Sequence, residues 1–231
     1  MVVEGERDAF REYCLNGEGQ EAFHRIKRDL DAVYMDFPHP EDPLTYGDPE
    51  PSKRDSYKTD RWRGVQDIAG NVSGIAESAT LVWLVTGEER YLAKAKEFLL
   101  TSCDWALAPD WESGEVVGAT DVYYNDEGNF RLWRKLPLVY DQLRDELTPA
   151  EKQRVLTHFK ERGERTVEWI RRSNIAGLKR NSLEVKPSSH PVRFMAMVGL
   201  TGLALWDDLP EQARDWYNFA YVFYRDQFSP F

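Results

Sequence analysis

Apolar residues recur along most of this chain at spacings of three and four, which is the period of amphipathic helices. Ile68, Val72 and Ile75, for example, continue one apolar stripe through a stretch that is also rich in small residues. No stretch alternates apolar and polar residues as a half-buried strand would. The pattern therefore predicts an all-α protein with these helices: Glu6–Leu15, Glu18–Asp36, Val65–Thr86, Glu88–Leu107, Glu127–Leu147, Pro149–Ser173, Pro191–Trp206 and Pro210–Phe228.

Residues that start or stop helices fall between these segments. Gly87 follows Val65–Thr86, and glycine commonly closes a helix in the left-handed conformation. Thr148 and Glu151 match a capping box, with Pro149 at the first helical position. Pro137 lies inside Glu127–Leu147 and should kink or break that helix. The last six helices therefore pair as three antiparallel hairpins with tight turns.

Three long polar segments separate these helices, and the hairpin turns are short by comparison. They are Pro38–Asp60, Pro109–Asp126 and Asn174–His190. When inner and outer helices alternate, the long connections should gather at one rim of the domain. Functional residues are often found on such loops.

The composition fits a soluble globular domain and argues against several other classes of protein. The 231 residues are 42% hydrophobic and carry a formal net charge of -10, so non-specific binding to nucleic acid is not expected. Cys14 and Cys103 are the only cysteines, so neither a disulfide framework nor a metal knuckle is indicated. No apolar run of transmembrane length is found, and Met1–Glu6 does not resemble a signal peptide.

One stretch inverts this acidic balance. Between Arg171 and Arg193, Glu184 is the only acidic residue, and a local cationic segment indicates a site for an anionic ligand. His190 precedes Pro191, which suits the first position of a helix, so the histidine should lie beside free backbone N–H groups. Alternatively, Ser189 is only a helix cap and His190 only a surface residue. The basic residues of the stretch are Arg171, Arg172, Lys179, Arg180, Lys186 and Arg193.

Several motifs resemble the helical hairpins of toroidal polysaccharide lyases, above all the heparinase II/III-like group with its related alginate lyases. They are Gly70–Tyr91, which ends in Leu84–Tyr91, together with Tyr140–Leu143, Leu147–Glu151 and Ser189-His190-Pro191. The resemblance runs from about Glu18 to Phe231. It implies that residues 1–231 form a single incomplete (α/α) toroid domain of antiparallel hairpins, with 60–231 its clearest part. Members of the group continue into antiparallel β-sheet domains, so the chain would be the N-terminal portion of a longer protein.

The resemblance also implies an activity, which is cleavage of uronate-containing polysaccharide by β-elimination. A basic or amide side chain offsets the charge of the C5 carboxylate, a Tyr or His removes the C5 proton, and a Tyr commonly protonates the leaving oxygen. His190 aligns with the histidine of the family's toroid. The family's catalytic Tyr and its metal-bearing β domains would follow Phe231. Residues 1–231 alone would then be nearly inactive, without a cofactor of their own, and the whole protein periplasmic or secreted.

These arguments predict His190 as the catalytic residue and an anionic polysaccharide or oligosaccharide as the partner. Structural alternatives exist: an ion pair for Arg193, a core position for Trp133 and a helix cap for Asn129. The predicted substrate-binding residues are Asn181, Lys186, Ser189, Arg193, Tyr123, Tyr124, Asn129 and Trp133.

Two other functions fit the same pattern. A glycoside hydrolase on an α/α toroid would need two carboxylates across the scissile bond, and the loop acids available are Asp121, Asp126 and Glu127. The second alternative is a carbohydrate-binding helical module without catalytic activity.

Overall fold

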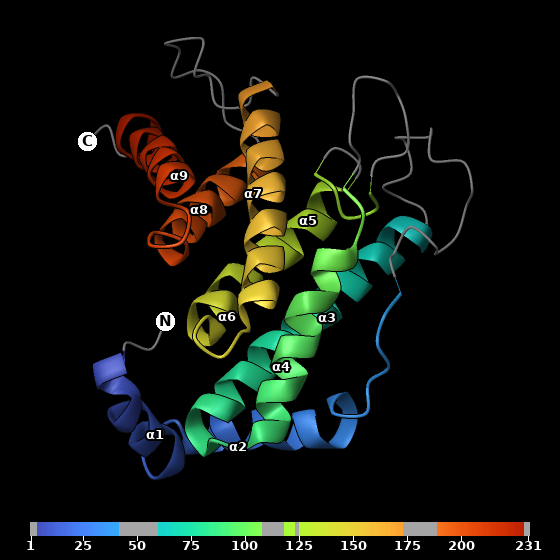
Figure 1. Ribbon diagram of the computed structural model, residues 1–231, viewed down its shortest axis with the longest axis vertical. Coiled ribbons are helices and arrows are strands. Elements are labelled where there is room, and N and C mark those ends of the chain that lie inside the picture. The colour runs from blue at the N-terminus through green and yellow to red at the C-terminus, as the bar shows by residue number, and fades with distance from the viewer. Residues whose placement is uncertain (1–3, 42–59, 108–117, 123–124, 173–188, 229–231) are drawn as a thin grey trace.

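The computed structural model describes residues 4–41, 60–107, 118–122, 125–172 and 189–228 (Figure 1). Every regular element in these ranges is a helix and none is a strand, so the prediction of an all-α protein is confirmed for them. The α-helices are α1 (Arg7–Leu15), α2 (Gln20–Asp29), α3 (Asp60–Thr86), α4 (Glu89–Thr101), α5 (Asp126–Trp133), α6 (Leu136–Leu143), α7 (Pro149–Arg172), α8 (Ser189–Ala204) and α9 (Pro210–Phe223).

Helix α3 is the central element of the domain. It packs against α1, α2, α4, α5 and α6. Figure 1 shows α3 and α4 side by side, with α1 and α2 across their lower end and α8 and α9 on the opposite side of the molecule. Because α3 has neighbours on several sides, its apolar residues are not confined to one stripe: Val72, Leu84 and Val85 point to different sides of the helix, and all three are buried.

The prediction that the chain has no apolar run of transmembrane length is wrong for α3. Arg63–Thr86 is long and apolar enough to cross a membrane by those two criteria alone. In the structure, however, 61% of its most apolar window is buried inside the domain. Burial of this kind is what a core helix of a globular domain requires, and packing against protein accounts for its apolar composition.

Two helix boundaries match their predicted signals, whereas α3 begins at Asp60 before the predicted Val65 and α4 ends at Thr101 before the predicted Leu107. Gly87 has a φ of 71° and its N–H donates to the carbonyl of Trp83 at 2.7 Å, which closes α3. At the start of α7, the Thr148 N–H donates to Glu151 Oε2 at 2.8 Å, and the Glu151 N–H donates to Thr148 Oγ1 at 3.3 Å. These reciprocal bonds are the predicted capping box.

The predicted helix Glu127–Leu147 is two helices in the structure. α5 ends at Trp133 and α6 begins at Leu136, so Arg134 and Lys135 lie at a break. Pro137 occupies the first turn of α6, where its missing N–H costs no helical hydrogen bond. The break follows from that preference.

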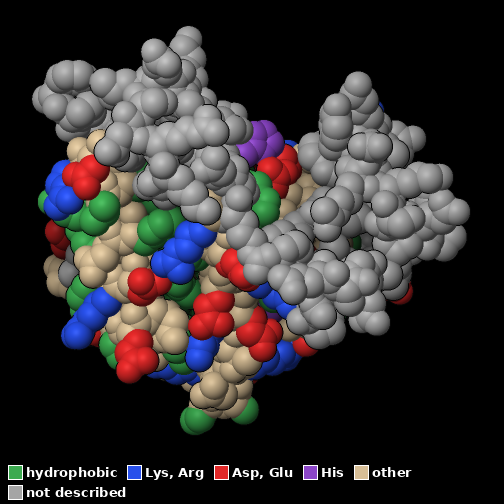
Figure 2. Space-filling view, turned by 90° about the horizontal axis from the view of Figure 1, so that it is seen from above, with side chains coloured by type: hydrophobic (Ala, Val, Ile, Leu, Met, Phe, Trp, Pro, Cys, Tyr) green, Lys and Arg blue, Asp and Glu red, His purple; other side chains and the backbone are tan. Residues whose placement is uncertain are grey.

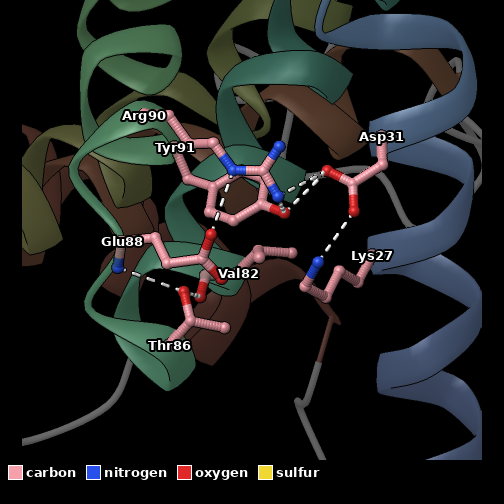
Figure 3. A network of polar contacts seen from close by, with 7 residues as sticks. All are labelled: Lys27, Asp31, Val82, Thr86, Glu88, Arg90 and Tyr91. Carbon is pink, nitrogen blue, oxygen red and sulfur yellow. Dashed lines mark hydrogen bonds and ion pairs between the residues drawn. The ribbon is translucent and has the colours of Figure 1, made fainter.

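A network of charged and polar side chains connects α2 and the turn that follows it to the start of α4 (Figure 3). Asp31 accepts hydrogen bonds from Lys27 Nζ at 2.7 Å and from the Tyr91 hydroxyl at 2.6 Å, and Arg90 Nη2 lies 3.2 Å away. Burial alone would raise the pKa of the Asp31 carboxyl, but these hydrogen bonds outweigh it and lower the pKa. The network therefore joins two helices that are separated in the chain by α3 and by the segment before it.

Candidate functional site

His190 and Asp126 come together from two different helices. Asp126 is the first residue of α5, whose N-cap Asn125 accepts a hydrogen bond from the Gly128 N–H at 2.9 Å. His190 lies in the first turn of α8, which begins at Ser189 rather than at Pro191 as predicted. Nδ1 of His190 is 2.6 Å from Oδ2 of Asp126. The ends of two predicted polar segments, Pro109–Asp126 and Asn174–His190, thus meet at one contact.

This contact determines what the imidazole can do. When the ring is neutral, a hydrogen bond to the Asp126 carboxylate requires the proton on Nδ1, which leaves the lone pair on Nε2. Nε2 has no hydrogen-bond partner within the described part of the chain, and the side chain is 40% exposed. A carboxylate that orients an imidazole in this way is the arrangement of a general base in catalytic triads.

Glu127 and Arg193 form a second pair beside the first. Arg193 Nη2 contacts Glu127 Oε1 closely, and Nη1 donates to Oε2 at 3.4 Å. The guanidinium carbon lies 4.6 Å from the centre of the Phe130 ring. Glu127 Oε1 is also 3.6 Å from Nδ1 of His190, so both acids of α5 face the basic side chains of α8. The structure thus shows the ion-pair alternative for Arg193, whose side chain remains 36% exposed.

Asn129, a predicted substrate-binding residue, is fully buried. Its Nδ2 donates to Thr166 Oγ1 at 3.1 Å, and its Oδ1 accepts from Arg162 Nη1 at 2.8 Å. Its side chain therefore serves the contact between α5 and α7 and offers no surface to a ligand. It is not the helix cap either, because Asn125 has that position.

Trp133, a second predicted substrate-binding residue, is 1% exposed. Its ring meets Phe159 and Trp216 edge to face, with centroids 6.0 Å apart in each case. Such packing supports the alternative that Trp133 is a core residue, because a bound sugar would need an open face of the ring. Trp133 thus anchors α5 in the core and does not line the site.

The remaining predicted substrate-binding residues cannot be placed against His190. Ser189 lies in the first turn of α8, and its side chain is outside the described residues. The others also lie outside the described residues: Asn181, Lys186, Tyr123 and Tyr124.

The loop acids considered for a hydrolase are engaged with basic partners. Asp121 is 1% exposed, and its Oδ2 accepts from Arg165 Nη1 at 2.9 Å. Asp126 holds His190 and Glu127 holds Arg193. None of the three is therefore an open carboxylic acid facing another carboxylate across a gap.

Sequence reasoning missed the role of Asp126 as the partner of His190. The two residues are 64 positions apart, and acidic residues in the first turn of a helix are common because they favour the positive end of the helix dipole. The only signal was positional, since both residues end long polar segments. On the face seen from above, histidine atoms lie beside acidic ones (Figure 2).

Arg162 organises the buried polar residues behind the site. It is 2% exposed, and Nη1 donates to the Thr120 carbonyl at 2.8 Å as well as to Asn129. Its Nε donates to Nε2 of His158 at 3.1 Å. Burial, and then the nearby guanidinium groups of Arg162 and Arg154, hold the pKa of His158 well below its ordinary value of 6.5.

This histidine predicts an acid-sensitive stability. Because the folded pKa is depressed, the unfolded state binds one more proton below about pH 6.5, and stability falls as the pH decreases through that value. Each such proton lowers the free energy of unfolding by about 1.4 kcal/mol per pH unit. In urea unfolding between about pH 7 and pH 5, His158→Gln should lose less stability than wild type.

The comparison with the variant isolates this group. Asp31 and the other carboxyls with lowered pKa titrate below this window, and the burial-raised pKa of Asp141 acts with the opposite sign but equally in both proteins. Equal slopes for wild type and His158→Gln would show that His158 is not the group responsible.

A comparison with protein-family models found no match, and a comparison with curated proteins found none of significant similarity.

Proposed function

We propose that this chain is the helical part of a polysaccharide lyase that cleaves uronate-containing polysaccharide by β-elimination. The hydrogen bond of 2.6 Å between His190 Nδ1 and Asp126 Oδ2 carries the proposal, because it leaves Nε2 available as a general base on a partly exposed face. The resemblance of the Ser189-His190-Pro191 motif to heparinase II/III-like lyases points to the same histidine.

The proposal includes the arrangement of the helices, which form an incomplete (α/α) toroid of antiparallel hairpins. The packing of α3 with α4 and of α8 with α9 supports it, since each pair is joined by a short turn. His190 would then stand at the rim where a sugar chain crosses the helical domain.

The reaction assigns each group one task. Nε2 of His190 takes the proton at C5, and the electron pair of that C–H bond forms a double bond between C4 and C5. The C4–O bond breaks, and an acid protonates the leaving oxygen. Asp126 holds the Nδ1 proton and offsets the positive charge that develops on the ring. Candidates for neutralising the C5 carboxylate remain Arg193, Asn181 and Lys186, and the acid remains the tyrosine that the resemblance puts after Phe231.

The glycoside hydrolase is the weaker candidate. Hydrolysis needs one carboxylic acid and one carboxylate facing each other across the glycosidic bond, roughly 5–9.5 Å apart. Asp121 is buried with Arg165, and the adjacent residues Asp126 and Glu127 each hold a basic side chain. A histidine held by an aspartate suits proton abstraction better than it suits this chemistry.

The product separates the candidate functions. The protein at its full natural length is mixed with alginate, heparan-type and other uronate polymers, and ultraviolet absorbance and reducing ends are followed together. We expect both signals to rise, because elimination leaves an unsaturated uronate at the new end. Reducing ends without absorbance would indicate a hydrolase, and binding without either signal would indicate a carbohydrate-binding module. Residues 1–231 alone should form little product.

A further inference from the structure

A pocket of about 350 Å³ lies beside the His190–Asp126 pair. Its floor includes Gly70 and Ser73 of α3, and its wall includes Arg131, Arg134 and Lys135 at the end of α5 and the break after it. Arg193 and Glu127 also line it, and Glu127 Oε1 is only 3.6 Å from His190 Nδ1. We call this the basic pocket. Its volume is within the usual range of small-ligand sites, about 300–1,000 Å³.

The charges of the basic pocket are incompletely compensated. Glu127 forms an ion pair with Arg193, and Lys135 Nζ forms an ion pair with Glu77 Oε2 at 2.6 Å. Arg131 and Arg134 have no acidic partner within the described part of the chain, although the protein as a whole carries a net charge of -10. Arg131 lies in the last turn of α5, and Arg134, the C-cap three positions later, keeps helical dihedral angles, so the two side chains leave the same face, where like charges repel. An anion between them would relieve that repulsion.

Two glycines of α3 leave room for the basic side chains of the pocket. A Cβ atom added at Gly70 would lie 3.2 Å from Nη1 of Arg131, and one added at Gly74 would lie 3.7 Å from Nζ of Lys135. The small residues of α3 thus let basic side chains lie directly across the helix. The Nε atom of Arg193 is buried without a hydrogen-bond acceptor in the described residues, which adds one unsatisfied donor at the same place.

We propose that the basic pocket binds the anionic substituent of a sugar residue next to the one processed at His190. Planar guanidinium groups match oxyanions with two parallel hydrogen bonds, so the ligand is a carboxylate or a sulfate ester carried on the polymer. This inference rests on the proposed function for the position of the sugar chain. It adds a subsite whose residues, Arg131 and Arg134, take no part in the proton transfer.

Binding without turnover tests the pocket. Affinities of short alginate oligomers, which carry carboxylates only, and of sulfated heparan-type oligomers are measured by calorimetry at low salt, with His190→Ala as the background. Adding Arg131→Ala and Arg134→Ala should weaken binding by about 10-fold or more, because charge-assisted hydrogen bonds are lost. It should also flatten the dependence on salt, since exposed charges are screened. The oligomer that loses more identifies the anion.

The matched control removes the same charge at the same spacing elsewhere. Arg25 and Arg28 are exposed on α2, three positions apart, so Arg25→Ala with Arg28→Ala should leave affinity within about two-fold. Equal losses in both double variants would reduce the effect to net charge and overturn the pocket. A second variant, Gly70→Leu, fills the floor without changing charge and should weaken binding several-fold.

The pocket and the proposed function can fail separately. Unchanged affinity in Arg131→Ala/Arg134→Ala, together with unsaturated product from the natural protein, overturns the pocket and leaves the lyase standing. Loss of affinity in that variant, together with no product from any uronate polymer, supports the pocket and overturns the lyase.

Discussion

His190→Ala should lower the rate of uronate elimination by the natural protein by about 10²–10⁴-fold, the usual contribution of one general base. The loss should appear in kcat, because in the proposed mechanism the imidazole accepts the proton that is transferred in the transition state. Removal of the imidazole also removes its hydrogen bond to Asp126, so the variant should lose about 1–2 kcal/mol of the free energy of unfolding and still fold. Initial rates and urea unfolding, measured on the same preparations, check both statements.

Two further variants separate proton transfer from other effects. Asp126→Asn should lower the rate by about 10²-fold or more, because an amide can donate to Nδ1 and thereby favour the wrong tautomer. His24→Ala removes an exposed histidine from α2 and should leave the rate unchanged. If Asp126→Asn retained the wild-type rate, the hydrogen bond between α5 and α8 would be structural only.

Trp133→Ala should lower the free energy of unfolding by about 3–5 kcal/mol, the usual cost of truncating a buried Trp. The indole is 1% exposed and fills the space between Phe159 and Trp216. The cavity left by the indole would close only partly, because Gly163 of α7 already lies against the ring of Trp216. A Cβ atom there would lie 2.3 Å from the Trp216 ring and 2.9 Å from that of Trp133.

Urea unfolding at pH 7 measures this loss, and Trp206→Ala is the matched control. Trp206 is 38% exposed and packs on Tyr217 at the end of α8, so its truncation should cost about 1 kcal/mol or less. Similar losses for the two variants would contradict the assignment of Trp133 to the core and return it to the list of possible sugar contacts.

The helices were predictable because their signals are local. Gly87, the Thr148–Glu151 capping box and Pro210 each act within a few residues of the boundary that they define. Val33 shows where a local rule stops. It belongs to the apolar stripe of an ideal helix, yet it is 58% exposed, because residues Leu30–Tyr34 form a π-helix whose wider turn moves it off the stripe.

The site was only partly predictable, because its contacts join distant parts of the chain. His190 could be proposed from its motif, but its pairing with Asp126 depends on how α5 packs against α8. Asn129 was misleading for the same reason. It is a polar residue close to a long polar segment, and only the position of α7 reveals that Thr166 and Arg162 satisfy its amide in the interior. Sequence periodicity does not carry such information.

Chemical rescue of His190→Ala by imidazole tests most directly whether His190 is the base. The natural protein and the variant are supplied with a uronate polymer, and unsaturated product is followed as imidazole is added. We predict that the variant forms little product alone, and that its rate rises with imidazole concentration while the wild-type rate stays constant. A variant that forms product at the wild-type rate without imidazole, or rates that imidazole raises equally in both proteins, would contradict the assignment.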